Sequence, residues 1–361
     1  LYKGPVLTAL MYDILLRFRL SEIAITADIA QAYLQISVNP ADRDFLRFLW
    51  YDDINEIEPK ISKFRFTRVI FGAGPSQFLL NGVAKVHLEK YEKEDPEFVA
   101  KVKRSFYVDD FNTSVKGYDE ALELFSKTKD RFVEANFDLR KWQTNHPKLR
   151  EEIRKYEDGK CGGPINGKVL GITWDVKNDY LKMDFKSTVQ EAETIKPTKR
   201  NILKLLAGIY DPLGFFQPVV VSLKILFQKI CLTKIGWDDV ISEGLKDMFW
   251  VIIKEIRKYE LNTPRCYFSA DLLDPIEKVE LHSFSDGSKE AYGGSIYLKS
   301  VIARGKMTVS FVTAKSRVVP ASKKLTIPRI ELLANLITSR LVVSVLRALE
   351  HDLILLDRCK D

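Results

Sequence analysis

Cysteine, histidine and long apolar runs are scarce in this chain of 361 residues, and each scarcity excludes a class of protein. The four cysteines are too far apart for a recognisable metal-ligand spacing; they are Cys161, Cys231, Cys266 and Cys359. They indicate reduced intracellular thiols rather than a disulfide framework. The longest apolar run, residues 219–226, contains a lysine and is too short to span a membrane.

The N-terminus has neither an initiator methionine nor a signal peptide. Residues 1–5 are typical of the middle of a domain, so we expect a fragment of a longer polyprotein. There is no internal repeat and no low-complexity tract. With 46% hydrophobic residues, the chain is long enough for two or three domains with their own cores.

The net charge of +7 is moderate, but the basic residues are clustered. The clusters are Lys101, Lys103 and Arg104; Lys196, Lys199, Arg200 and Lys204; and Lys315, Arg317, Lys323 and Lys324. Solvated helix faces explain about half of such clusters. Here they alternate with an acidic centre, which predicts a phosphate backbone passing over bound metals. Binding of that kind weakens steeply with salt.

The most informative segment is Tyr-Val-Asp-Asp at residues 107–110, which lies between two strand-forming runs. This places Asp109 and Asp110 at the tip of an expected hairpin. A third acid, Asp28, ends the strand-like run 22–29. An Asp–Asp pair at a turn is by itself usually only turn chemistry. Three acids at adjacent strand ends can instead hold two divalent cations, as phosphoryl transfer requires.

The periodicity of apolar residues predicts how the chain is organised. Helices are expected at 11–20, 76–91 and 118–136, and strands at 22–29, 45–51, 63–66, 101–107 and 111–115. This order suits a two-layer domain with helices on one side of a sheet. The next segment is helical, a polar segment follows, and strands at 279–285, 293–297 and 307–312 then precede a long helix at 328–349.

Five segments, in order, resemble the palm motifs of reverse transcriptases; they are residues 28–33, 71–78, 107–110, 137–142 and 169–174. Four more narrow the resemblance to the Bel/Pao class of long-terminal-repeat retrotransposon polyproteins; they are residues 15–19, 210–214, 313–317 and 326–333. The resemblance covers nearly the whole chain. It implies an α/β protein with four parts: an α+β polymerase palm with partial fingers, a helical thumb and connection, a linker and an incomplete ribonuclease H-like domain. Their expected bounds are 1–190, 191–260, 261–276 and 277–361.

The resemblance implies an RNA-directed DNA polymerase that uses two Mg²⁺ ions, for which Mn²⁺ can substitute. Asp28 and Asp109 would bridge the two metals, Asp110 would assist, and the backbone carbonyl of Ile29 would add a ligand. Carboxylates suit this role because Mg²⁺ prefers hard oxygen ligands.

The same resemblance assigns residues that bind the substrates. Tyr33 matches the steric gate against a ribose 2′-hydroxyl; the alternative is a core aromatic. Phe71 and Gly72 would shape the nucleotide pocket, although residues 75–77 (Pro-Ser-Gln) depart from the usual Ser-Pro, which leaves the loop geometry open. Lys141 would protonate the leaving pyrophosphate, or is a solvated surface lysine.

Leu170 and Gly171 match the primer grip of the family, in which the glycine permits close approach of the backbone to the primer strand. In the ribonuclease H-like part, Asp286 ends a strand and Glu331 is expected in the first turn of the long helix. A glutamate there is also ordinary helix-dipole chemistry. Asp357, expected after a strand at 353–356, is the nearest match to a third metal ligand. The usual Asp-Ser pair is missing and a fourth ligand would follow the chain, so this site is expected to be truncated.

The expected partners are an RNA or DNA template-primer and deoxynucleoside triphosphates, with no membrane. Protease and integrase domains of a polyprotein that integrates DNA are expected outside this segment. The family implies an intracellular, cytoplasmic virus-like particle with access to the nucleus. The alternative function is a catalytically inactive remnant or a host-retained nucleic-acid-binding protein. Missing upstream finger strands favour this alternative, and the complete set of palm carboxylates argues against it.

Overall fold

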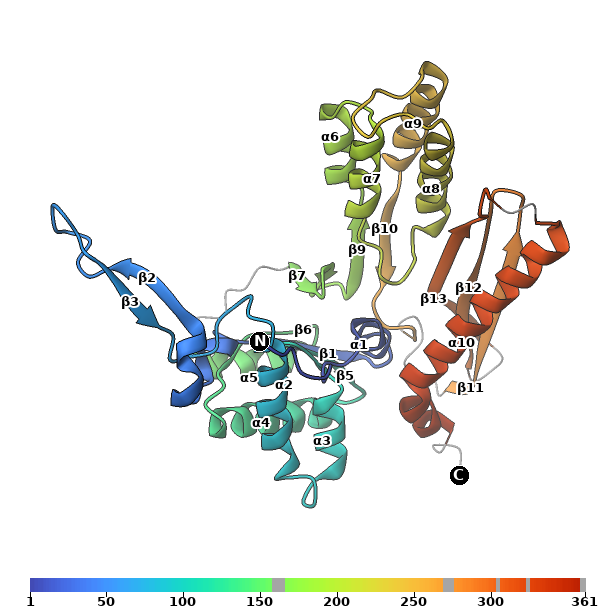
Figure 1. Ribbon diagram of the computed structural model, residues 1–361. Coiled ribbons are helices and arrows are strands. Elements are labelled where there is room, and N and C mark those ends of the chain that lie inside the picture. Colours follow the sequence, from blue (N-terminus) through green and yellow to red (C-terminus); the bar gives the residue numbers. More distant parts are fainter. Residues whose placement is uncertain (158–165, 269–275, 303–305, 323–324, 358–361) are drawn as a thin grey trace. The chain divides into compact units, whose positions relative to one another are not determined.

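The computed structural model describes residues 1–157, 166–268, 276–302, 306–322 and 325–357. It divides into two compact units: Leu1–Ile14 with Ile23–Gly163, and Leu15–Glu22 with Pro164–Asp361. Both units combine helices with sheets, which confirms the α/β class (Figure 1). The expected domain boundaries at 190, 260 and 276 stay predictions.

The first unit is built on an antiparallel sheet in the order β4-β5-β1-β6. Its strands are β1 (Ile23–Ile29), β4 (Phe106–Tyr107), β5 (Asp110–Val115) and β6 (Leu139–Thr144). Alternate residues of β1 point to opposite faces, as the sequence predicts. Ile23, Ile25 and Ala27 join the hydrophobic core, whereas Thr26 and Asp28 lie opposite Asn112 and Asp110 of β5.

Four helices pack their apolar faces onto the core side of this sheet (Figure 1). They are α2 (Ser76–Glu89), α3 (Pro96–Lys103), α4 (Tyr118–Glu134) and α5 (Pro147–Tyr156). The strand expected at 101–107 is wrong except for its last two residues, because α3 continues through Lys103. The side chain of Asp95 accepts from the Phe98 amide at 3.2 Å and Pro96 opens the helix, a start signal that outweighs the β-prone composition.

Shorter elements complete the first unit. They are the helix α1 (Met11–Phe18), of which residues 11–14 belong here, the 3-10 turns η1 (Ala32–Gln35) and η2 (Pro40–Leu46), and the ribbon of β2 (Arg47–Tyr51) and β3 (Ile61–Arg65). In Figure 1 the ribbon projects away from α2–α5. Phe48 and Phe64 stack across it with ring centroids 5.8 Å apart, and both side chains are exposed.

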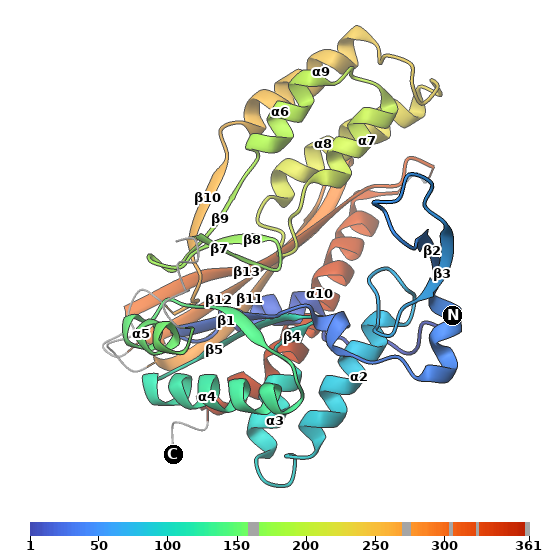
Figure 2. The ribbon, with the colours of Figure 1, turned by 90° about the vertical axis from the view of Figure 1, so that its left-hand side faces the viewer.

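The second unit begins with an antiparallel sheet in the order β10-β9-β8-β7 and a bundle of four helices that lie side by side (Figure 2). The strands are β7 (Asn166–Val169), β8 (Ile172–Asp175), β9 (Tyr180–Asp184) and β10 (Glu260–Pro264); the helices are α6 (Lys186–Thr194), α7 (Lys199–Gly208), α8 (Gln217–Leu232) and α9 (Glu243–Ile256). β10 occupies the start of the segment expected to be a linker. That pairing with β9 is non-local, so composition could not reveal it.

A second, three-stranded sheet in the order β11-β12-β13 carries the long helix α10. The bounds are β11 (Ile276–Gly287), β12 (Ala291–Ile302), β13 (Lys306–Val318) and α10 (Ile327–Asp357). These strands and this helix confirm the pattern predicted from the sequence. Residues Ile327–Leu349 reach the length and apolar content of a membrane span, which is weak evidence because core helices of soluble proteins pass the same test.

Two of the four cysteines lie among the described residues: Cys231 is exposed, Cys266 is buried, and neither forms a disulfide. Cys161 and Cys359 lie outside the described residues.

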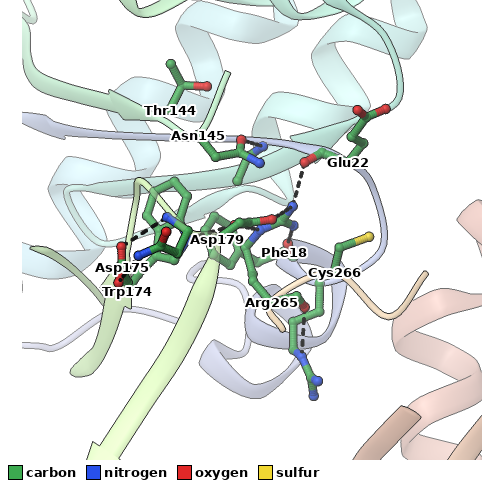
Figure 3. Close-up of polar contacts among 12 residues, drawn as sticks. Phe18, Glu22, Thr144, Asn145, Trp174, Asp175, Asp179, Arg265 and Cys266 are labelled. Atoms are coloured by element: carbon green, nitrogen blue, oxygen red, sulfur yellow. Dashed lines mark hydrogen bonds and ion pairs between the residues drawn. The ribbon is translucent and has the colours of Figure 1, made fainter. Parts of the chain in front are cut away.

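A buried arginine joins distant segments of the second unit (Figure 3). Arg265 is fully buried and makes a two-pronged ion pair with Asp179, with Nε–Oδ1 and Nη2–Oδ2 distances of 2.7 and 2.8 Å. Its remaining donors bond to the carbonyl oxygens of Phe18 and Glu22 at 2.5 and 2.6 Å. All three segments must therefore be folded together before this charge is satisfied.

We expect Asp179→Asn to destabilise the protein by about 3–5 kcal/mol, because it leaves the Arg265 charge buried without a counter-charge. Asn suits the left-handed backbone at this position (φ 59°), so the change removes charge without adding strain. The measurement is the free energy of unfolding in denaturant. Asp238→Asn is the matched control, since its pair with Arg200 is exposed and should contribute little to stability. Equal losses in the two variants would contradict the role given to Arg265.

Candidate active site

The Tyr-Val-Asp-Asp segment forms a tight hairpin between β4 and β5 of the first unit. Tyr107 pairs with Asp110, so Val108 and Asp109 are its two-residue loop. Val108 has a φ of 58°, which is unusual for a β-branched residue and is normally reserved for glycine at this point of a hairpin. Contact of Val108 with the core and a 3.0 Å bond from the Ile29 amide to the Asp109 carbonyl hold the loop in place.

The hairpin brings the three predicted carboxylates into one region of the sheet. Asp28 near the end of β1 lies directly opposite Asp110 of β5, and like charges in this position repel. Burial raises the pKa of Asp110 to about 6, and the charges of Asp109 and Asp28 add to the rise. Burial also raises the pKa of Asp109, with a further contribution from Asp28. The arrangement therefore concentrates negative charge that the folded chain only partly neutralises.

Lys141 supplies the nearby positive charge, and an irregularity in β6 directs it there. Thr26 pairs with Gln143 and Asp28 with Arg140, so two residues of β6 stand opposite Ala27. This β-bulge includes Lys141, whose φ is 54°. Its ammonium lies 3.1 Å from Asp28 Oδ2.

That ion pair is weakly held. The Lys141 side chain is 76% exposed, and exposed pairs typically contribute about 1 kcal/mol or less. A stronger cation could replace the lysine.

The residues predicted to bind the nucleotide lie in the same unit. Tyr33 of η1 meets Phe71 edge-on at 4.9 Å, and burial together with the Asp109 charge raises the pKa of the Tyr33 phenol. Tyr33 is thus both partly packed and electrostatically coupled to the carboxylates. Phe71 is exposed, and Gly72 has a φ of 79° with open space where a Cβ would point. No described residue crowds Gly72, so its backbone conformation is what requires glycine.

The described residues contain no group of three or more His, Cys, Asp or Glu side chains placed to hold a metal ion as they stand. The chemistry of the donor set nevertheless fits a hard divalent cation: three neighbouring carboxylates, of which Asp109 and Asp110 have raised pKa values, and an exposed lysine as counter-ion. The Ile29 carbonyl as a ligand stays a prediction.

The predicted primer-grip residues form the β7–β8 hairpin of the second unit. Val169 pairs with Ile172, and the loop residues Leu170 and Gly171 have φ values of 46° and 89°. Positive φ at both positions is typical of a type I′ turn. The hydroxyl of Tyr210 donates to the Leu170 carbonyl, and a Cβ on Gly171 would lie 2.7 Å from its ring. The sequence analysis missed Tyr210 as the residue that requires this glycine.

The ribonuclease H-like carboxylates come from β11 and α10. A Cβ on Gly287 would lie 2.8 Å from Ile330 Cγ2, so β11 and α10 touch beside Asp286 and Glu331. Glu331 is the fifth residue of α10 and lies beyond the first turn, which corrects the expected position. The helix-dipole explanation of this glutamate is correspondingly weaker.

The strand expected before Asp357 is wrong. Residues 353–356 continue α10, and Asp357 is its last residue. It follows Glu331 by 26 residues of helix, a distance of about 39 Å along the axis. Asp357 therefore cannot join Asp286 and Glu331 in one metal site. The strand prediction for residues 353–356 failed because a short apolar segment is as compatible with a helix as with a strand.

Comparisons with known proteins agree with this architecture. Three solved structures share the fold of the chain at 14–15% identity: the foamy viral protease-reverse transcriptase with an RNA/DNA hybrid (TM-score 0.55), its dRH form with double-stranded DNA (0.58) and the protein with double-stranded DNA (0.53). They match 95%, 97% and 98% of this chain, which spans 39%, 52% and 61% of theirs. At this identity the likeness establishes the fold alone.

In sequence, residues 198–357 match the family described as the Pao retrotransposon-like RNaseH-like domain. The match starts before α7, so it includes helices that the sequence analysis assigned to a separate thumb and connection. No curated protein matches the chain. The family match supports a retroelement ribonuclease H-like region at residues 198–357, and the solved structures support a reverse transcriptase fold.

The raised pKa of Asp110 predicts a pH-dependent stability in metal-free buffer. Because the folded-state pKa of about 6 exceeds the ordinary 3.8, the folded protein binds this proton more tightly than the unfolded chain. Stability should fall as pH rises from 3.8 to about 6 and stay lower above it. Asp110→Asn should therefore be more stable than the parent above pH 6, by on the order of 1 kcal/mol after discounting for solvent.

The measurement is denaturant unfolding of both proteins above pH 6 and near pH 4. The advantage of Asp110→Asn should shrink at the lower pH. Asp130→Asn, on the exposed surface of α4, controls for the general loss of one acid. An advantage that is independent of pH, or equal in the control, would show that Asp110 is not the strained carboxylate.

Proposed function

We propose that this chain is the polymerase and ribonuclease H-like region of a retroelement reverse transcriptase, which adds deoxynucleotides to a primer on an RNA or DNA template. The observation that carries the proposal is the opposed pair Asp28 and Asp110, coupled to Asp109 on a strained hairpin. Strain and raised carboxyl pKa values are characteristic of catalytic sites. The foamy viral structures with an RNA/DNA hybrid or double-stranded DNA support nucleic acid as the partner.

Asp28 and Asp109 would hold two Mg²⁺ ions, with Asp110 supporting them. When bound, the metals would activate the primer hydroxyl and neutralise the triphosphate. Lys141 holds Asp28 through an exposed ion pair and so keeps the site partly neutral without metal. Once released, its ammonium is free to donate a proton to the leaving pyrophosphate, whereas Tyr33 limits the space beside the sugar.

For the ribonuclease H-like part we propose nucleic-acid binding with at most an incomplete cleavage site. Among the described residues only Asp286 and Glu331 remain as candidate ligands once Asp357 is excluded. A two-metal hydrolysis site needs more carboxylates than these two. The surrounding protease and integrase domains, and an intracellular location in a virus-like particle, belong to the same proposal.

Asp109→Asn should lower primer extension by the full-length protein that carries this chain by about 10²–10³-fold or more, because it removes the charge that would hold the metal. Extension of a labelled primer in the presence of Mg²⁺ is the measurement. Asp130→Asn on α4 is the matched control and should extend normally. Parent-like extension by Asp109→Asn would rule out this site.

Tyr33→Ala should weaken discrimination against ribonucleotides by about 10–100-fold, since the ring would no longer exclude a 2′-hydroxyl. Tyr33→Phe keeps the ring and its edge-on contact with Phe71, so it should discriminate like the parent. The measurement is the ratio of kcat/KM for deoxy- and ribonucleotides. Unchanged selectivity in Tyr33→Ala would assign Tyr33 to packing alone.

A further inference from the structure

The second unit contains a basic cavity that none of the proposed catalytic residues lines. It has a volume of about 140 Å³ and lies between β13 and α10. Its polar walls are formed by Tyr292, Lys315, Arg317 and Arg340, and the remaining walls by leucine, isoleucine and serine side chains. No acidic side chain of the described residues lines it.

Strand register explains why these side chains meet. Arg317 pairs with Tyr292, and Lys315 pairs with Gly294, so all four positions share one face of the sheet. A Cβ on Gly294 would lie 1.8 Å from Thr338 Oγ1, which identifies this face as the one that α10 covers. Two residues further along α10, Arg340 reaches the same cavity.

The cations of the cavity lack counter-charges within the part of the chain that the structure describes. None of the ion pairs there involves Lys315, Arg317 or Arg340. On α8, burial lowers the pKa of Lys224, and the positive charges of Lys315 and Arg317 lower it further.

Among the described residues, the acid whose charge raises the pKa of Lys224 is Asp211. The carboxylate of Asp211 already accepts from the amides of Phe215 and Phe216 at 2.8 and 2.9 Å. Among the described residues, the cavity therefore presents positive charge that no ion pair balances.

We propose that the basic cavity of Tyr292, Lys315, Arg317 and Arg340 binds one phosphate group of a nucleic-acid backbone; this rests on the nucleic-acid partner of the proposed function. Guanidinium groups bind phosphate through paired donors, and a tyrosine hydroxyl adds another. One water needs about 10–15 Å³ on the same measure of volume, so the cavity has room for a tetrahedral anion. Lys323 and Lys324, grouped with these residues by sequence, lie outside the described residues.

The first experiment measures the affinity of the full-length protein for a labelled RNA/DNA hybrid between about 50 and 200 mM salt. Arg317→Gln and Arg340→Gln should each lower the slope of log affinity against log salt by about one. Because both would hold the same phosphate, the double variant should also lose about one rather than two. Slopes that match the parent, or that add in the double variant, would overturn the shared phosphate site.

Arg347→Gln is the matched control, since Arg347 lies on α10 but not among the cavity residues. It should keep the slope of the parent, whereas an equal loss would mean a diffuse positive field and no site. Thermal unfolding with inorganic phosphate separates this proposal from the proposed function. Phosphate should raise the Tm of the parent and of Arg347→Gln more than that of Arg317→Gln.

The parent protein could fail to bind the hybrid and still show a phosphate-dependent rise in Tm that requires Arg317. That result would contradict nucleic acid as the partner and support a binding site for small anions alone. Equal Tm shifts in all three proteins would overturn the site even where the hybrid binds. Hybrid binding that an acidic peptide abolishes in the parent but not in Arg317→Gln would overturn the assignment to a backbone phosphate in favour of a protein partner.

Discussion

The buried guanidinium of Arg265 is the constraint on which the second unit depends. It bonds to residues 247, 243 and 86 positions away in the chain, so it is satisfied only when all of them are folded. Arg19 extends the same centre: its Nε donates to the Arg265 carbonyl and its Nη1 to that of Phe311 on β13. The Tyr267 ring lies 4.2 Å from its guanidinium carbon. Removing the Asp179 carboxylate leaves the Arg265 charge buried without a counter-charge, which costs more free energy than the loss of a single apolar contact.

Two of the segments that carry the retrotransposon resemblance also make contacts between elements that are distant in the sequence. Residues 15–19 contain Arg19, and residues 210–214 connect three elements. Asp211 accepts from amides at the start of α8, and Gly214 packs so closely that a Cβ would lie 2.0 Å from the Ala314 carbonyl oxygen. Ala314 in turn donates its amide to Leu213 at 3.1 Å. The helices and the three-stranded sheet thus pack as one body, which explains why the family match runs without a break from residue 198.

Periodic patterns made much of the fold predictable, and non-local contacts account for the rest. The alternation along β1 and the 3.6-residue stripe of α4 are local, so the sequence suffices for both. The pairing of β10 with β9 and the bulge that directs Lys141 depend on a partner strand and leave no local signal. The carboxylates could be predicted as a site because their residue types suit metal chemistry, and their role stays a prediction. The sequence grouped Lys315 with Arg317, but it could not add Arg340, which reaches the basic cavity from α10.

Backbone strain occurs at the proposed sites but is not confined to them, since Gln31 and Lys234 also have positive φ, at 51° and 57°. Asn136 and Asp179 also have positive φ, but these residue types tolerate it. Val108, Lys141 and Leu170 do not, and each such residue costs on the order of 1–3 kcal/mol. A turn selected only for folding would carry glycine or asparagine there. Val108 also packs on the core, so replacing it with glycine would relieve strain but release the loop that carries Asp109. The chain therefore retains a costly conformation because it fixes where that carboxylate stands.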